Sequence, residues 1–238
     1  MPYDILAISA HPDDIEIAMG GTVARLTAEG HRFLIIDLCD GEPTRHGKPG
    51  IRKEQAQQAA RALGADRVFL DFQDRFIVDT IEARLQVARL IREHQPRWIF
   101  STTECGVHPD HKAIRDITDA AVFYARLPKW EEIPGGHVLD GTEPWEIDRL
   151  FFYYCRMEPS WDRFDFAINV SDHYEKKREA IAAYESVFSG KQAAFIHRVE
   201  SADRYFGSLV GVEFAEIFRC RSPIVIDDLQ ALGKARFG

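Results

Sequence analysis

Short apolar runs alternate with amphipathic segments along the first hundred residues of the chain. Four of the runs are bounded by turns and predict buried strands, at residues 4–9, 32–38, 67–70 and 97–101. The segments between them place apolar residues at helical spacing and predict helices, at residues 15–29, 51–63 and 80–93. Each helix is followed by a residue that ends it, namely Gly30, Gly64 and Pro96. This alternation is typical of a parallel sheet built from right-handed βαβ units.

The second half of the chain is less regular. Helical spacing continues at residues 110–124, whereas residues 127–144 carry proline, glycine and charge without periodicity and predict a loop. Further elements are expected as strands at 149–154 and 164–170 and a helix at 174–187, and none can be assigned from residue 189 onward. We therefore predict an α/β fold: a Rossmann-like parallel β-sheet flanked by helices, forming a single domain over residues 1–238 with a C-terminal β/α extension.

Composition narrows the range of partners. A chain of 238 residues suffices for one large domain with a substantial core. Its formal net charge of -8 gives no long-range attraction for nucleic acid or anionic lipid. No apolar run approaches the roughly 20 residues that cross a bilayer, and the N-terminus lacks the basic region of a signal peptide. We expect a cytoplasmic protein that binds neither nucleic acid nor membranes.

The four cysteines are far apart in the sequence and form no CxxC pair: Cys39, Cys105, Cys155 and Cys220. This spacing supports neither a disulfide framework nor a zinc ribbon. Buried free thiols are expected.

Two short segments gather carboxylates and imidazoles at the ends of predicted strands. Residues 10–16 read AHPDDIE after the first strand, and residues 108–111 read HPDH after the fourth. Ligands of open α/β sheets bind beyond the carboxyl ends of the strands, where both segments lie. Helix capping alone is an alternative explanation for one such segment. Two together indicate a cation or a reaction, because uncompensated buried charge is costly.

The residue types predict a catalytic metal centre. His11 and Asp14 can reach one ion from a single strand-to-helix turn, and His111 adds a third ligand while leaving positions for water and substrate. Nitrogen and carboxylate ligands suit zinc, and also iron, cobalt or manganese.

Three further residues complete the predicted catalytic set. Asp13, beside the ligands, is placed to accept a proton from the attacking water, and His108 is placed to donate on the opposite side of the scissile group. Asp110 is expected to hold the tautomer of a histidine through a hydrogen bond.

These motifs resemble those of the PIG-L, or LmbE-like, family of metal-dependent N-acetylglucosaminyl deacetylases, whose pattern is A-H-P-D-D-x-E followed by H-P-D-H. The chain matches both without substitution, and the likeness extends over most of its length. It is most like the branch that contains the bacillithiol and mycothiol biosynthetic deacetylases. The resemblance implies Zn2+ on His11, Asp14 and His111, with Asp13 as general base and His108 as the electrophilic or acid group.

The resemblance also concerns substrate and assembly. It implies a small-molecule amino-sugar substrate held by Arg52 and Asp74, and a homo-oligomer. The residues themselves leave open whether Arg52 pairs with a substrate carboxylate or contacts Gln55 on the helix surface. Some relatives place a tyrosine near the site where this chain has Phe195, whose ring cannot donate the same hydrogen bond, so His197 is an alternative.

Other residues have structural interpretations. Trp130, Trp145 and Trp161 are expected to pack in the core, and Lys176-Lys177-Arg178 to form a solvated helix face.

We predict a metal-dependent hydrolase that removes the acetyl group from an N-acetylated amino sugar. A metal-dependent amidase or esterase acting on a larger conjugate is an alternative, as is a non-catalytic metal-retaining sugar-binding module. A nucleotide-binding Rossmann protein is disfavoured, because the first strand leads into His-Pro-Asp-Asp and not into a glycine-rich phosphate turn.

Overall fold

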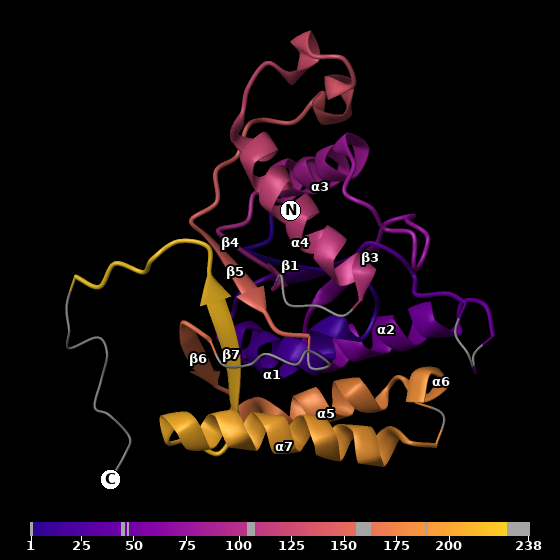
Figure 1. Ribbon diagram of the computed structural model, residues 1–238, viewed down its shortest axis with the longest axis vertical. Helices are drawn as coiled ribbons and strands as arrows, with labels where there is room; N and C mark the ends of the chain where they lie inside the picture. Colours follow the sequence, from indigo (N-terminus) through magenta and orange to yellow (C-terminus); the bar gives the residue numbers. More distant parts are fainter. Residues whose placement is uncertain are drawn as a thin grey trace.

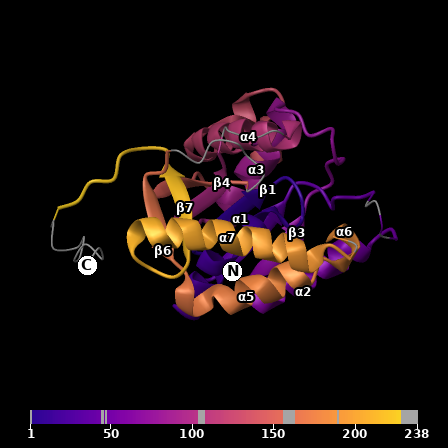
Figure 2. The same ribbon diagram turned by 60° about the horizontal axis from the view of Figure 1, so that its bottom comes forward.

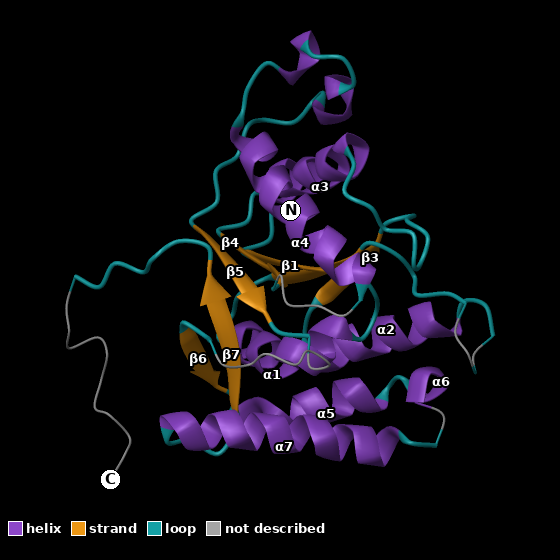
Figure 3. Cartoon of the chain, viewed as in Figure 1, coloured by secondary structure: helices purple, strands orange, loops and turns teal. Residues whose placement is uncertain are grey.

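The computed structural model describes residues 2–43, 46, 48–103, 108–155, 163–188 and 190–227, so the predictions for Cys105 and Trp161 lie outside the described residues. Within these ranges, seven strands form one sheet in the order β3-β2-β1-β4-β5-β7-β6. Helices cover both faces of the sheet (Figure 1, Figure 3). The chain thus has the predicted α/β architecture.

The first five strands are parallel to one another: β1 (Ile5–Ser9), β2 (Phe33–Asp37), β3 (Asp66–Phe69), β4 (Trp98–Thr102) and β5 (Arg149–Tyr153). The connecting helices are α1 (Asp14–Ala28), α2 (Ile51–Leu63), α3 (Ile81–His94) and α4 (Pro109–Arg126). Local sequence explains their ends. The Thr80 side chain accepts the backbone N–H of Ala83 at the start of α3, and Gly64 adopts a left-handed conformation after α2.

The central strand is buried on both faces, which explains its unbroken apolar sequence. Ile5 and Ala7 belong to the core that β1 shares with α1 and α2, whereas Leu6 and Ile8 belong to the core shared with α3 and α4. Successive side chains of a strand point to opposite faces, so one apolar run fills both cores.

The C-terminal extension adds two strands and three helices: β6 (Phe166–Asn169), α5 (Tyr174–Ala182), α6 (Glu185–Phe188), α7 (Gln192–Val210) and β7 (Ala215–Cys220). β7 lies between β5 and β6 and runs antiparallel to both, so the sheet is mixed and not wholly parallel. The single helix predicted at 174–187 is two helices, and the unassigned end of the chain contains α7 and β7. α5 packs on α1 and α2, and α7 lies beside α5 (Figure 2).

Residues 127–144 form a loop with two short 3-10 turns, η1 (Trp130–Glu132) and η2 (Gly136–Leu139). The indole N–H of Trp130 donates to the carbonyl of Tyr124 at 3.0 Å, and that of Trp145 donates to Pro96 at 2.7 Å. Both rings pack with the core shared by α3 and α4, as predicted. In the described ranges, none of the helices combines the length and apolar character that a bilayer crossing requires.

Helix α1 has a kink, and a buried carboxylate from β7 binds the backbone N–H groups that follow it. Met19 leaves the helical conformation, with φ −145° and ψ 23°. The carboxylate of Glu216, on β7, accepts the backbone N–H groups of Gly21 at 3.0 Å and Thr22 at 2.7 Å. Glu216 thus acts as an anionic cap for the second half of α1.

Lys177 neutralises this buried carboxylate. Its Nζ lies 2.6 Å from Glu216 Oε1 and 2.8 Å from Asp203 Oδ2, and the side chain is 0% exposed. The prediction of a solvated face at residues 176–178 is therefore wrong for Lys177, because α5 turns this position inward against α1, whereas the neighbouring Lys176 is exposed.

The topology determines where a site can form. From β1 the chain passes outward through β2 and β3, then returns to place β4 on the other side of β1. The crevice beyond the carboxyl ends of β1 and β4 is the switch point of such a sheet, where ligands bind. Both α1 and α4 begin there.

Candidate functional site

The turn after β1 brings two aspartates into the crevice. Asp13 precedes α1 with φ 101°, a conformation that is uncommon and costly for a residue with a Cβ. Asp13 and Asp14 are each only 8% exposed. Backbone strain and two adjacent buried carboxylates at one turn indicate a functional site.

Asp14 lies between two imidazoles. Its Oδ1 is 3.2 Å from His111 Nε2, and its Oδ2 is 3.6 Å from His11 Nδ1. Donor atoms around a tetrahedral zinc ion with bonds of about 2 Å are separated by about 3.3 Å. Asp14 therefore lies near both predicted histidine ligands, one beside each of its carboxylate oxygens, and its 3.2 Å separation from His111 suits donors that share an ion.

A second layer of carboxylates orients His11. Its Nε2 lies 3.2 Å from Asp110 Oδ2 and 3.2 Å from Asp74 Oδ1. Asp110 is 1% exposed and also accepts the backbone N–H of Arg75 at 2.8 Å. If a metal ion takes the place of the Nδ1 proton, the proton kept on Nε2 leaves Nδ1 as the ligand atom on the side of Asp14, the arrangement expected of a metal-ligating histidine. Asp110 thus lies within hydrogen-bond distance of a histidine, the contact on which its predicted role depends.

The electrostatics of the crevice favour a cation. Burial lowers the pKa of His11, but hydrogen bonds to Asp14 and Asp74 outweigh burial and raise it to about 10. Burial raises the pKa of Asp13 to about 6, and the Asp14 carboxylate adds to this while Arg52 opposes it. The cluster is thus rich in negative charge and stabilises positive charge within it. Asp110 Oδ1, also buried, has no hydrogen-bond partner in the described part of the chain.

His108 faces the same crevice from the start of α4. Its ring centroid lies 4.7 Å from that of His11 and 5.1 Å from that of His111. Its Nδ1 accepts the backbone N–H of Asp110 at 3.2 Å. Burial lowers its pKa, as do the neighbouring imidazoles, so the ring is neutral near pH 7. Because Nδ1 accepts, the proton of the neutral ring is on Nε2, which is then a donor.

Arg52, on α2, contacts the turn that carries Asp13. Its guanidinium donates to the carbonyls of Gly41 and Pro12, each at 2.8 Å, and Nη2 lies 3.3 Å from Asp13 Oδ2. The described side-chain contacts of Arg52 are directed to this turn and not to Gln55, whose Oε1 accepts a hydrogen bond from Ser186. Gly41 is required for the approach: a Cβ there would lie 2.6 Å from Arg52 Cζ.

Two features of the site were not predicted. Cys155, beyond the end of β5, has a donor atom within 4.8 Å of donor atoms of Asp14 and His111. Beneath the crevice, Arg67 is fully buried between Glu16 and Asp37. Glu16, the last residue of the AHPDDIE segment, therefore stabilises β3 through its ion pair with Arg67. Sequence spacing gave no signal for Cys155, because the residues it approaches are more than 40 positions away.

The C-terminal candidates have other contacts. Phe195 lies on α7, where its ring stacks on Phe188 with centroids 4.3 Å apart. His197 is exposed on the same helix. These contacts give neither residue a role at the donor cluster.

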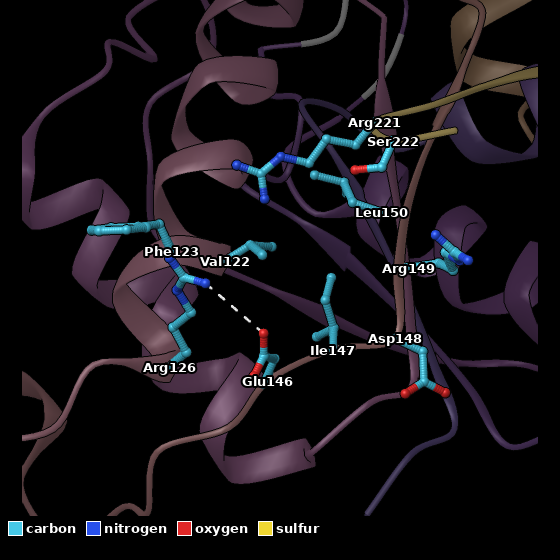
Figure 4. Close-up of a pocket in the computed structure, with 10 residues that line it drawn as sticks. All are labelled: Val122, Phe123, Arg126, Glu146, Ile147, Asp148, Arg149, Leu150, Arg221 and Ser222. Carbon is cyan, nitrogen blue, oxygen red and sulfur yellow. Dashed lines mark ion pairs between the residues drawn. The ribbon is translucent and has the colours of Figure 1, made fainter. Parts of the chain in front are cut away.

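A separate pocket of about 260 Å³ lies at the amino end of β5, between the last turn of α4 and Arg221 (Figure 4). Arg126 and Glu146 face each other across it at 3.9 Å. None of the predicted site residues lines this pocket, and it opens at the edge of the sheet opposite to the crevice.

The fold and the crevice define an α/β protein with a histidine and aspartate site at the switch point of its sheet. Residues 6–122 match the family described as PIG-L: GlcNAc-PI de-N-acetylase, and the chain belongs to this family.

Named relatives extend the similarity beyond the matched region. The chain is 27% identical over 227 residues to diacetylchitobiose deacetylase of Thermococcus kodakarensis, covering 90% of this chain and 82% of that protein. It is 32% identical over 206 residues to a probable N-acetyl-alpha-D-glucosaminyl L-malate deacetylase 2 of Bacillus cereus, covering 78% of this chain and 84% of that protein. The crystal structure of the conserved protein TT1542 from Thermus thermophilus superposes with a TM-score of 0.84 at 36% identity, covering 94% of this chain and 97% of that one.

Proposed function

We propose that this protein is a zinc-dependent N-deacetylase that releases acetate from an N-acetylglucosaminyl compound. The observation that carries the proposal is the position of Asp13, a buried carboxylate in a strained turn directly beside the His11, Asp14 and His111 cluster. The names of the relatives, which are deacetylases of N-acetylated amino sugars, support the same reaction class.

His11, Asp14 and His111 would hold the metal ion. The donor set fits such an ion, because Asp14 lies close to both imidazoles and two further carboxylates, those of Asp74 and Asp110, lie 3.2 Å from His11. When bound, the ion would supply Lewis acidity toward the amide carbonyl and lower the pKa of water. The absence of a thiolate from this set of three leaves iron, cobalt and manganese as alternatives to zinc.

Asp13 acts as the general base. Its carboxylate takes a proton from the water that attacks the acetyl carbonyl, and its raised pKa, about 6, brings its basicity closer to the working pH than that of an ordinary aspartate. Arg52 holds this carboxylate and the Pro12 carbonyl in place.

His108 acts on the other side of the amide. Its Nε2–H donates to the oxyanion of the tetrahedral species, as a preorganised donor does. Collapse of that species breaks the C–N bond, and the proton held by Asp13 or His108 passes to the leaving nitrogen. The products are acetate and a free amine.

The substrate contacts belong to the same proposal. Asp74 is expected to bind a sugar hydroxyl through a remaining lone pair of its carboxylate, whose Oδ1 faces His11 at 3.2 Å and whose Oδ2 lies 3.5 Å from Arg75 Nε. Arg52 is expected to hold a substrate anion through its guanidinium, whose five N–H donors exceed those used by the Gly41 and Pro12 carbonyls. Cytoplasmic location and a homo-oligomeric assembly stay predictions of the sequence analysis.

The test is amine release by metal-stripped protein, with and without added Zn2+, Fe2+, Co2+ or Mn2+. The substrates are N-acetylglucosamine, N-acetylglucosaminyl-malate, N-acetylglucosaminyl-inositol and diacetylchitobiose. Zinc-dependent release from one of them is the expected result. Hydrolysis of larger amides alone would favour the amidase alternative, and stoichiometric metal binding without any hydrolysis would favour a sugar-binding module.

A further inference from the structure

Cys155 comes from a strand that contributes nothing else to the predicted site. It lies two residues beyond β5, which pairs with β4 along the whole of its length. The carboxyl ends of parallel strands meet at one edge, so this position faces the crevice that α1 and α4 enter. The residue is 5% exposed.

The thiol is close to two of the three predicted metal ligands. One donor atom each from Asp14, His111 and Cys155 forms a group in which all separations are within 4.8 Å. Bond lengths of about 2.0 Å to nitrogen or oxygen and about 2.3 Å to sulfur allow one ion to span such a group after small side-chain movements.

We propose that Cys155 is an additional ligand of the metal ion that Asp14 and His111 hold, a proposal that rests on the metal dependence of the proposed function. Coordination replaces the S–H bond by a sulfur–metal bond, and the proton is released to solvent. The metal donors of this protein would then come from the segments that follow β1, β4 and β5. The Cys155 thiolate would join His11, Asp14 and His111, and a fifth position would stay open for the water that the proposed hydrolysis needs, because catalytic zinc can expand to five ligands.

The chemical consequence is metal preference. A thiolate is a soft ligand that suits zinc and is poorly matched to manganese, which prefers oxygen donors. Cys155 should therefore favour Zn2+ over Mn2+, and its replacement by serine should narrow the difference between the affinities for these two ions.

The experiment uses Co2+, whose absorption reports its ligands. Wild-type protein is stripped of metal, loaded with one equivalent of Co2+, and compared with Cys155→Ser loaded in the same way. We expect a thiolate-to-cobalt charge-transfer band in the near ultraviolet of the wild type and its loss in Cys155→Ser, while the visible bands of bound cobalt persist in both. Matched controls are Cys39→Ser and Cys220→Ser, which should keep the band.

X-ray absorption of the zinc-loaded wild type provides a measurement that needs no variant. A sulfur scatterer at about 2.3 Å from zinc is expected besides the nitrogen and oxygen shell. A shell of nitrogen and oxygen alone, or a cobalt band that survives in Cys155→Ser, would overturn the role of Cys155 while leaving the deacetylase proposal intact. Failure of the wild type to bind either metal would overturn both.

Discussion

The guanidinium of Arg52 lies 3.3 Å from the carboxylate of Asp13 while its other hydrogen bonds hold the backbone carbonyls of Pro12, after β1, and Gly41, after β2. Asp13 sits at φ 101°, so its turn needs support from outside. One arginine thus stabilises both the strained backbone and the charge of the proposed base.

Asp13→Asn tests the base directly. The amide keeps the size of the side chain but cannot accept a proton, so turnover should fall by about 10²- to 10⁴-fold. Metal content should be unchanged, since Asp13 is not among the proposed ligands. Steady-state amine release and metal analysis measure the two quantities. Asp116→Asn, on the exposed face of α4, is the control and should match the wild type; equal turnover in Asp13→Asn would reject the assignment.

Arg52→Met tests the positioning role through pH. Arg52 lowers the pKa of Asp13, while burial raises it. Removing the positive charge should raise that pKa, so Asp13 becomes protonated at a higher pH. Because only the ionised carboxylate can act as the base, kcat/KM should begin to fall at a higher pH when the pH is lowered. The acid limb of the pH profile should therefore move upward in Arg52→Met and not in Arg61→Met, on the exposed side of the same helix. A higher KM with an unmoved limb would instead indicate a purely substrate-binding arginine.

The sequence pattern predicted the strands and helices that pack against their neighbours in the sequence. The five parallel strands follow from apolar runs, because each such strand is buried by the helix next to it in sequence. β7 pairs with strands more than 45 residues earlier, and no periodicity specifies that it inserts between β5 and β6. The donors in the two motifs were predictable for the same reason, since each follows its own strand. The position of Cys155 near Asp14 and His111 was not predictable, because it depends on the order in which β1, β4 and β5 lie in the sheet.

Lys177, the buried cation of α5, is a second feature that the sequence pattern could not predict. Lys176 and Lys177 are adjacent and chemically identical, so composition predicted one solvated face. Only the packing of α5 on α1 distinguishes the two, and it places Lys177 against Glu216 and Asp203.

Lys177→Met tests this assignment against Lys176→Met. Loss of the buried ammonium leaves two carboxylates without their cation, so the free energy of unfolding should fall by about 3–5 kcal/mol. The same change at Lys176, whose side chain is 56% exposed, should alter stability by less than about 1 kcal/mol. Urea denaturation of both variants measures the difference. Equal midpoints would show that Lys177 is not held in the buried network.

Gly21→Ala tests the close approach of α1 to the C-terminal extension. A Cβ at Gly21 would lie 2.7 Å from Val170 Cβ, which is far inside normal contact, whereas a Cβ at Gly20 would lie 3.1 Å from Lys177 Cγ, a contact that a shift of a few tenths of an ångström relieves. Alanine gains roughly 1 kcal/mol of helix propensity over glycine at either position. Overpacking against Val170 costs about 1–3 kcal/mol, so it should outweigh that gain at Gly21. Thermal unfolding should therefore show a lower Tm for Gly21→Ala than for Gly20→Ala, and the reverse order would mean that α1 can move away from Val170 without loss.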